Sequence, residues 1–152
     1  MTLGEFFKGL AENRPLVSAV AAWAVAQVLK TIINYLINKE WKAERLWGSG
    51  GMPSSHSAFV TALVVAVGMV EGVGSTFFAI SVVLATVVMY DASGVRRAAG
   101  RQARIINQIV LDFYKEKQVK TEKLKELLGH TPLEVFVGAI LGGVIAWMEC
   151  MH

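Results

Sequence analysis

The sequence predicts an all-α membrane protein: a polytopic bundle of about four transmembrane helices with a basic amphipathic helix beside it. The chain has 152 residues, enough for one domain over 1–152, and 54% of them are hydrophobic. Its mean hydropathy of +0.48 is high for a soluble domain of this size. The apolar residues also cluster into long stretches. The alternative is a soluble α protein with buried helices, but too little of the remaining chain is polar enough to cover them.

The predicted spans follow the apolar stretches in chain order. They cover residues 15–37, 55–70, 76–90 and 133–148. The last three are short for a hydrocarbon core of about 30 Å, and the second would fit a re-entrant segment as well. We expect no cleavable signal peptide, because Glu5, Glu12 and Asn13 precede the first stretch and no small-residue cleavage site follows it cleanly. The single cysteine, Cys150, excludes an intrachain disulfide.

Lysine and arginine are distributed unevenly between the two sides of such a bundle. With four spans, the loops 38–54 and 91–132 share one side and hold most of the basic residues, whereas the other side has Lys8 and Arg14. The positive-inside rule puts both basic loops in the cytoplasm and both termini outside. Trp41 and Trp47 are expected at the membrane interface beside the first loop. This predicts an integral protein of the inner (plasma) membrane with a cytoplasmic functional face.

The basic loop of about 93–130 contains an amphipathic helix running from Val95 to about Lys117. Such a helix either lies on the membrane and attracts anionic headgroups, or packs on the bundle with a solvated basic face. Arg96 and Arg97, nearest the third span, are the candidates to turn inward and hold phosphate, because guanidinium suits phosphate oxygens.

A polar elbow, Gly50 to Ser57, runs directly into the second apolar stretch. A helix start has unpaired N–H groups and the positive end of the helix dipole, so Ser54 and Ser55 form a candidate phosphate site. Alternatively, one of these serines is simply the N-cap. His56 lies at the same helix start.

His130 precedes a second helix start, Thr131-Pro132-Leu133-Glu134. Threonine at the N-cap, proline next and glutamate at the third position make a capping box, which is one role for Glu134. The other role is to accept a hydrogen bond from the His130 imidazole, which would fix its tautomer and raise its basicity.

Polar residues also occur inside the first span, where Gln27, Lys30 and Asn34 lie on one helical stripe. Lys30 either snorkels to the surface or supplies positive charge to the site. Asp91 is expected to pair with Lys30 or with an arginine. A metal site would need His56, His130, Asp91 and Glu134 to converge, and neither histidine has a ligand at metal-binding spacing, so we expect no metal or cofactor. Nucleic-acid binding is disfavoured because no recognised motif is present.

Several of these motifs occur together in a known family. Pro53-Ser54-Ser55-His56, followed much later by His130 and Glu134, resembles the type 2 phosphatidic acid phosphatase superfamily. The runs GGMPSSHSA, MYDASGVRRAAGRQA and LKELLGHTPLEV resemble its divergent branch of small bacterial and plant membrane proteins, over residues 27–143.

The resemblance implies a membrane-embedded phosphohydrolase that acts on a lipid phosphate or diphosphate at the cytoplasmic leaflet through a phosphohistidine. His130 would be the nucleophile, His56 the acid that protonates the leaving alcohol, and Glu134 the group that orients His130. The phosphate oxygens would be held by Ser54, Ser55, Lys30, Arg96 and Arg97. The implied substrate is a phospholipid or isoprenoid phosphate, and the superfamily needs no metal.

The sequence departs from the superfamily pattern at several points. Ser55 replaces a glycine and Glu134 an aspartate, and no Ser-Arg pair precedes His130, since Leu124 occupies the arginine position. The first superfamily motif, KxxxxxxRP, has no clean counterpart. These departures keep a second hypothesis open, that of an inactive relative which binds anionic headgroups or scaffolds a membrane partner. The superfamily usually has six spans, so a smaller bundle is expected to need a homodimer to finish its core. Gly138, Gly142 and Gly143 would allow close helix contact.

Overall fold

The computed structural model describes residues 1–39, 51–114 and 129–151, and every regular element in these ranges is an α-helix. The expected positions of Trp41 and Trp47, and the end of the amphipathic helix near Lys117, lie outside the described residues. The elements in chain order are α1 (Leu3–Glu12), α2 (Arg14–Asn38), α3 (Ser55–Val70), α4 (Thr76–Ser93), α5 (Val95–Tyr114) and α6 (Pro132–Met151).

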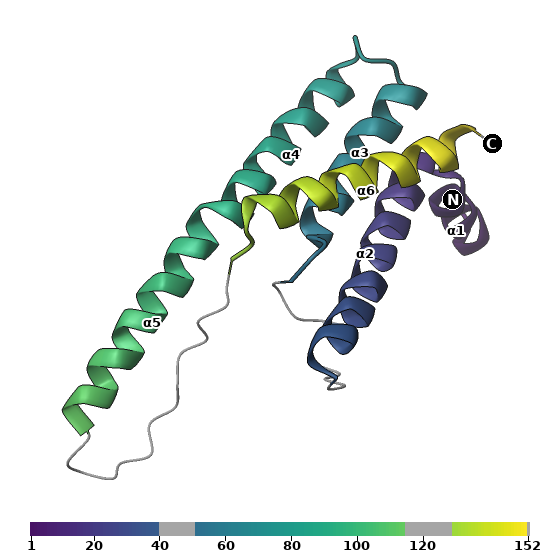
Figure 1. Ribbon diagram of the computed structural model, residues 1–152. Coiled ribbons are helices and arrows are strands. Elements are labelled where there is room, and N and C mark those ends of the chain that lie inside the picture. The colour runs from purple at the N-terminus through teal and green to yellow at the C-terminus, as the bar shows by residue number, and fades with distance from the viewer. Residues whose placement is uncertain (40–50, 115–128, 152) are drawn as a thin grey trace.

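The bundle is built around α3, which packs against α2, α4 and α6. Figure 1 shows α6 crossing α3, while α3 and α4 form a hairpin. Small side chains let these backbones approach closely. The core cluster consists of Ala22, Ala26, Ala58, Ala62, Ala66 and Ala146. At one end of the bundle α2 and α4 end and α3 and α6 begin. We call this end the histidine end, because His56 and His130 lie there.

Within the described ranges, three helical stretches are long and apolar enough to cross a membrane: Arg14–Ile37, Thr76–Leu111 and Pro132–Met151. The second predicted span, α3, is apolar but has only 16 residues, or about 24 Å of helix. The all-α bundle is therefore confirmed, and the described residues hold three helical stretches long enough to span a membrane and one shorter apolar helix. Lipid-facing surface is abundant, since Phe77, Val83 and Val87 of α4 are each more than half exposed.

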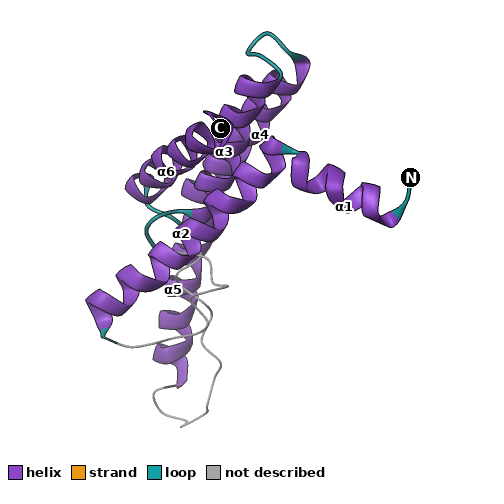
Figure 2. Cartoon of the chain, turned by 90° about the vertical axis from the view of Figure 1, so that its right-hand side faces the viewer, coloured by secondary structure: helices purple, strands orange, loops and turns teal. Residues whose placement is uncertain are grey.

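The amphipathic helix does not pack along the bundle beyond its junction with α4, and its position on the membrane surface stays a prediction. Figures 1 and 2 show α5 continuing beyond α4, away from the bundle. Among the described helices it contacts α4 alone. Only Gly94 separates the two helices, and its N–H still donates to the Tyr90 carbonyl at 2.8 Å, so the chain has little opportunity to turn at this junction.

An additional helix, α1, precedes the first span and was not predicted. It begins with a capping box in which the Thr2 hydroxyl accepts from Glu5 N–H and the Glu5 carboxylate accepts from Thr2 N–H. Asn13 alone separates it from α2, and the Asn13 side chain caps α2 by accepting from Leu16 N–H at 3.1 Å. A cap at this position restarts the helix in a new direction.

Glycines let α6 lie directly on α3. A Cβ at Gly138 would collide with the carbonyl oxygen of Ser54, and one at Gly142 with that of Ala58. These two glycines therefore allow close helix contact within the chain, between α6 and α3. Gly143 has looser surroundings, with Val65 Cγ2 at 3.9 Å from an added Cβ. The homodimer itself stays a prediction.

Candidate active site

The two histidines singled out in the sequence meet at the histidine end. His56 lies in the first turn of α3, and His130 lies two residues before α6. Their ring centroids are 6.0 Å apart and their planes make an angle of 82°. This separation is comparable with the width of one phosphate group.

Two backbone hydrogen bonds hold this end together. His130 N–H donates to the Ala92 carbonyl at the end of α4, at 3.0 Å. Ser54 N–H donates to the Glu134 carbonyl in the first turn of α6, also at 3.0 Å. Gly129 permits a further close approach, because a Cβ there would collide with the Arg97 backbone. The backbone at His130 is thereby held beside the end of α4 and the start of α5, and the starts of α3 and α6 are joined.

The His130 imidazole is buried but makes no hydrogen bond. Only 1% of the residue is exposed, and neither Nδ1 nor Nε2 has a partner within the described residues. Leaving a buried polar atom unpaired costs about 1–3 kcal/mol, so such atoms are rare in folded proteins. An imidazole in this state keeps both a lone pair and an N–H available for a ligand.

Positive charge accompanies the two rings. Lys30 of α2 is 3% exposed, and its ammonium donates to Gln27 Oε1 at 2.7 Å and to Ser55 Oγ at 3.3 Å. Burial, followed by the Lys30 cation and then by His56 and Arg96, lowers the pKa of His130 to about 4. His130 is therefore neutral at pH 7 and able to act as a nucleophile or base.

The serines of the elbow are engaged inside the protein. Ser54 is the N-cap of α3, and its hydroxyl accepts from Ser57 N–H at 3.4 Å and from the Ser57 hydroxyl at 3.0 Å. Ser55 accepts from Lys30. The capping alternative thus describes Ser54, and the phosphate-binding role of both serines stays a prediction.

Glu134 forms the capping box. Its carboxylate accepts from Thr131 N–H at 3.2 Å, while Glu134 N–H donates to the Thr131 hydroxyl at 3.3 Å. No hydrogen bond joins this carboxylate to the His130 ring. Of the two roles considered for Glu134, the structure shows the cap and not the orientation of His130.

The two arginines expected near the site differ. Arg96 Nε lies 2.7 Å from Asp91 Oδ2, so an arginine is the partner of Asp91, and the Arg96 charge acts on His130. Arg97, which is exposed as Arg96 is, meets the site segment through its backbone beside Gly129. Among the described residues, no group of three or more His, Cys, Asp or Glu side chains gathers to bind a metal ion.

A cavity of about 400 Å³ opens beside His56. It is lined by Trp23, His56, Phe59, Val60, Leu84 and Val88. We refer to it as the apolar cavity. Sequence reasoning missed it because apolar residues in a span resemble lipid-facing or core residues until the packing is known. It also left Gln27 out of the site, although Gln27 shares a helical stripe with Lys30.

Known proteins resemble this chain over most of its length. The model of the Divergent PAP2 family matches residues 11–145, most of the chain. The chain belongs to the Divergent PAP2 family. It is 45% identical over 145 residues to the uncharacterized membrane protein YuiD of Bacillus subtilis (strain 168), covering 88% of this chain and 91% of that protein. No solved structure matches it. Membership of the Divergent PAP2 family and the apolar helices identify a PAP2-related membrane protein and confirm the resemblance noted in the sequence.

Proposed function

We propose that this protein is a membrane phosphohydrolase that cleaves a lipid phosphate or diphosphate at the cytoplasmic leaflet of the inner membrane. The observation that carries the proposal is the buried, unpartnered His130 imidazole 6.0 Å from the His56 ring. Two imidazoles beside a buried cation suit phosphoryl transfer better than lipid anchoring, which needs the cation alone.

In the proposed reaction, a neutral nitrogen of His130 attacks phosphorus as the bond from phosphorus to the leaving alcohol breaks. His56 gives its proton to the departing oxygen. Water then attacks the phosphohistidine, His56 takes a proton from that water, and phosphate leaves His130 free. Lys30 and Arg96 stabilise negative charge on the phosphoryl oxygens throughout. The low pKa of His130 supports its role as nucleophile, since the ring is unprotonated at neutral pH.

The apolar cavity supports a lipid substrate. His56 is the one ionisable side chain among its lining residues. A leaving alcohol that places its hydrocarbon chain against Phe59 and Leu84 would bring its ester oxygen to His56. The excess of lysine and arginine in the loops of the histidine end supports a cytoplasmic site.

A second candidate function is the binding of anionic lipid headgroups without turnover. The observation that favours it is the Glu134 carboxylate, which is bonded to Thr131 in the helix cap and so leaves His130 without an acidic partner.

The deciding experiment measures phosphate release from lipid phosphates and diphosphates by the purified protein, beside His130→Ala, Lys30→Met and a matched control, Lys8→Met. Lys8 carries the same charge but lies in α1, at the other end of α2 from Lys30. We expect loss of activity in His130→Ala, a decrease of about 100-fold in Lys30→Met, and no change in Lys8→Met.

Labelled substrate provides a second measurement. Radioactive phosphate should become attached to the wild-type protein in an acid-labile form, and not to His130→Ala. Folded protein that binds these lipids yet releases no phosphate and takes up no label would instead establish the headgroup-binding function.

A further inference from the structure

The ten-residue helix α1 separates apolar from polar side chains around its circumference. At 100° per residue, Leu3, Phe6, Phe7 and Leu10 fall within one arc, which we call the apolar face of α1. Glu5, Lys8 and Glu12 occupy the opposite arc. The Lys8 ammonium lies 3.7 Å from Glu12 Oε1, along the polar side.

The described residues of the bundle leave the apolar face largely uncovered. No residue of α1 is buried, and Leu3 and Phe7 are 75% and 60% exposed. The helix contacts only α2 among the described helices. Four large apolar side chains on one short helix form a surface that water solvates poorly.

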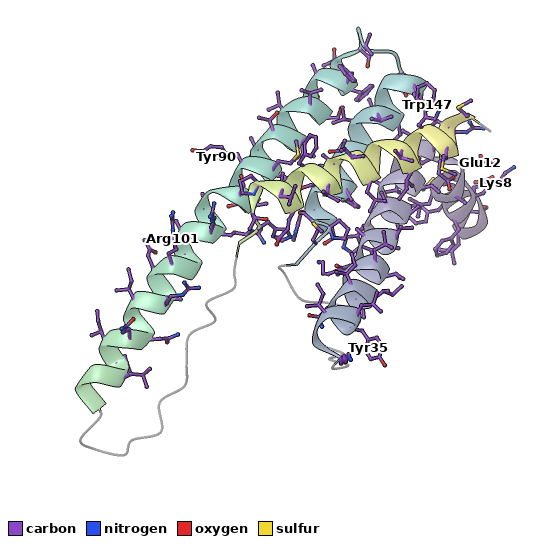
Figure 3. The ribbon with its side chains drawn as sticks, viewed as in Figure 1. Lys8, Glu12, Tyr35, Tyr90, Arg101 and Trp147 are labelled. Carbon is purple, nitrogen blue, oxygen red and sulfur yellow. The ribbon has the colours of Figure 1, made fainter. Side chains whose placement is uncertain are left out.

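The apolar face of α1 lies close to the start of a membrane-crossing helix. Asn13 is the one residue between α1 and α2, whose membrane-crossing stretch begins at Arg14. Figure 2 shows α1 projecting sideways from that end of α2, and Figure 3 shows Lys8 and Glu12 at the outer edge of the molecule. A helix tethered so closely to the start of a span, and turned across it, lies at the level where the bilayer meets water.

We propose that α1 lies in the membrane–water interface at the end of the bundle opposite the histidines. Its apolar face enters the acyl region, in continuity with the lipid-facing surface of α2, and Glu5, Lys8 and Glu12 remain in water. Because α1 carries two acidic side chains and one basic one, burial of apolar area drives its insertion, and anionic headgroups are not needed.

The test uses single cysteines bearing nitroxide labels in the full chain, with Cys150→Ser as background, in nanodiscs of phosphatidylcholine. Phe7→Cys and Leu3→Cys sample the apolar face, and Lys8→Cys and Glu12→Cys are the matched polar positions. We expect oxygen, which concentrates in lipid, to relax the apolar labels several-fold more than a water-soluble nickel chelate does, and the polar labels to show the reverse. Adding anionic lipid or salt should leave the pattern unchanged.

Two results would overturn the proposal. Equal access of the nickel chelate to all four positions would mean that α1 stays in water. Spin–spin broadening between labels on the apolar face would mean that a second copy of the chain covers it. The test requires no catalysis, so it stands whether or not the protein hydrolyses phosphate.

Discussion

At the scale of single residues, His130 combines burial with an unused capacity to form hydrogen bonds. Other buried polar side chains at this end are paired: Lys30 with Gln27 and Ser55, and Ser54 with Ser57. An imidazole held without partners while its surroundings are satisfied is available for a group that arrives from outside.

The lowered pKa of His130 predicts a pH-dependent stability. Unfolding returns the pKa from about 4 to its ordinary 6.5, so the unfolded chain binds more protons between these values. The contribution of the neutral His130 ring to the free energy of unfolding is therefore fully present above pH 6.5. It is lost as the pH falls toward 4, by about 3 kcal/mol in total. The melting temperature in detergent should fall more steeply from pH 7 to pH 4 for the wild type than for His130→Gln. Identical slopes would contradict the burial of a neutral ring.

At this scale, the sequence predicts which residues gather at the site better than it predicts their hydrogen-bond partners. His56, His130 and Lys30 were selected because polar groups next to apolar helices need a reason to be there, and the structure brings all three together. Glu134 had two geometrically sound roles in the sequence. The choice between them depends on a side-chain rotamer, which residue spacing does not determine.

At the scale of elements, the contact between α3 and α6 depends on glycines, which carry a hydrogen atom where other residues carry a Cβ. Gly142→Ala would bring a Cβ into the Ala58 carbonyl and separate the helices, at a cost of about 1–3 kcal/mol. Gly143→Ala, one residue away, meets only ordinary contact at 3.9 Å and gains helix propensity. Thermal unfolding should show a lowered melting temperature for Gly142→Ala and an equal or raised one for Gly143→Ala. Equal effects of both substitutions would show that the close approach is not needed.

The helices themselves were largely predictable, because apolar stretches and caps are local signals. The predicted range 55–70 coincides with α3, and the predicted 133–148 lies within α6. The approach of α6 to α3 and the direction of α5 were not predictable, since they depend on which faces meet. Helix α1 was not predicted, because its ten residues mix polar and apolar side chains and so form no apolar stretch.

At the scale of the whole molecule, the uneven distribution of basic residues predicts an orientation. Gly74 lies in the α3–α4 turn, before α4 begins, with open space around its Cα. Arg101, which is labelled in Figure 3, lies in α5, which follows the other end of α4. In cells carrying Cys150→Ser, a membrane-impermeant maleimide should label Gly74→Cys from outside and Arg101→Cys only after permeabilisation. The reverse pattern would move the site to the outer leaflet without altering its geometry.

The joining of the α3 and α6 starts has a consequence for biosynthesis. His56 enters the membrane early in translation, whereas His130 and the helix that anchors it emerge from the ribosome last. The hydrogen bond from Ser54 N–H to the Glu134 carbonyl forms only after α6 has inserted. A nascent chain that stalls after α5 therefore carries one imidazole without its counterpart, so the two histidines can meet only once α6 is in place.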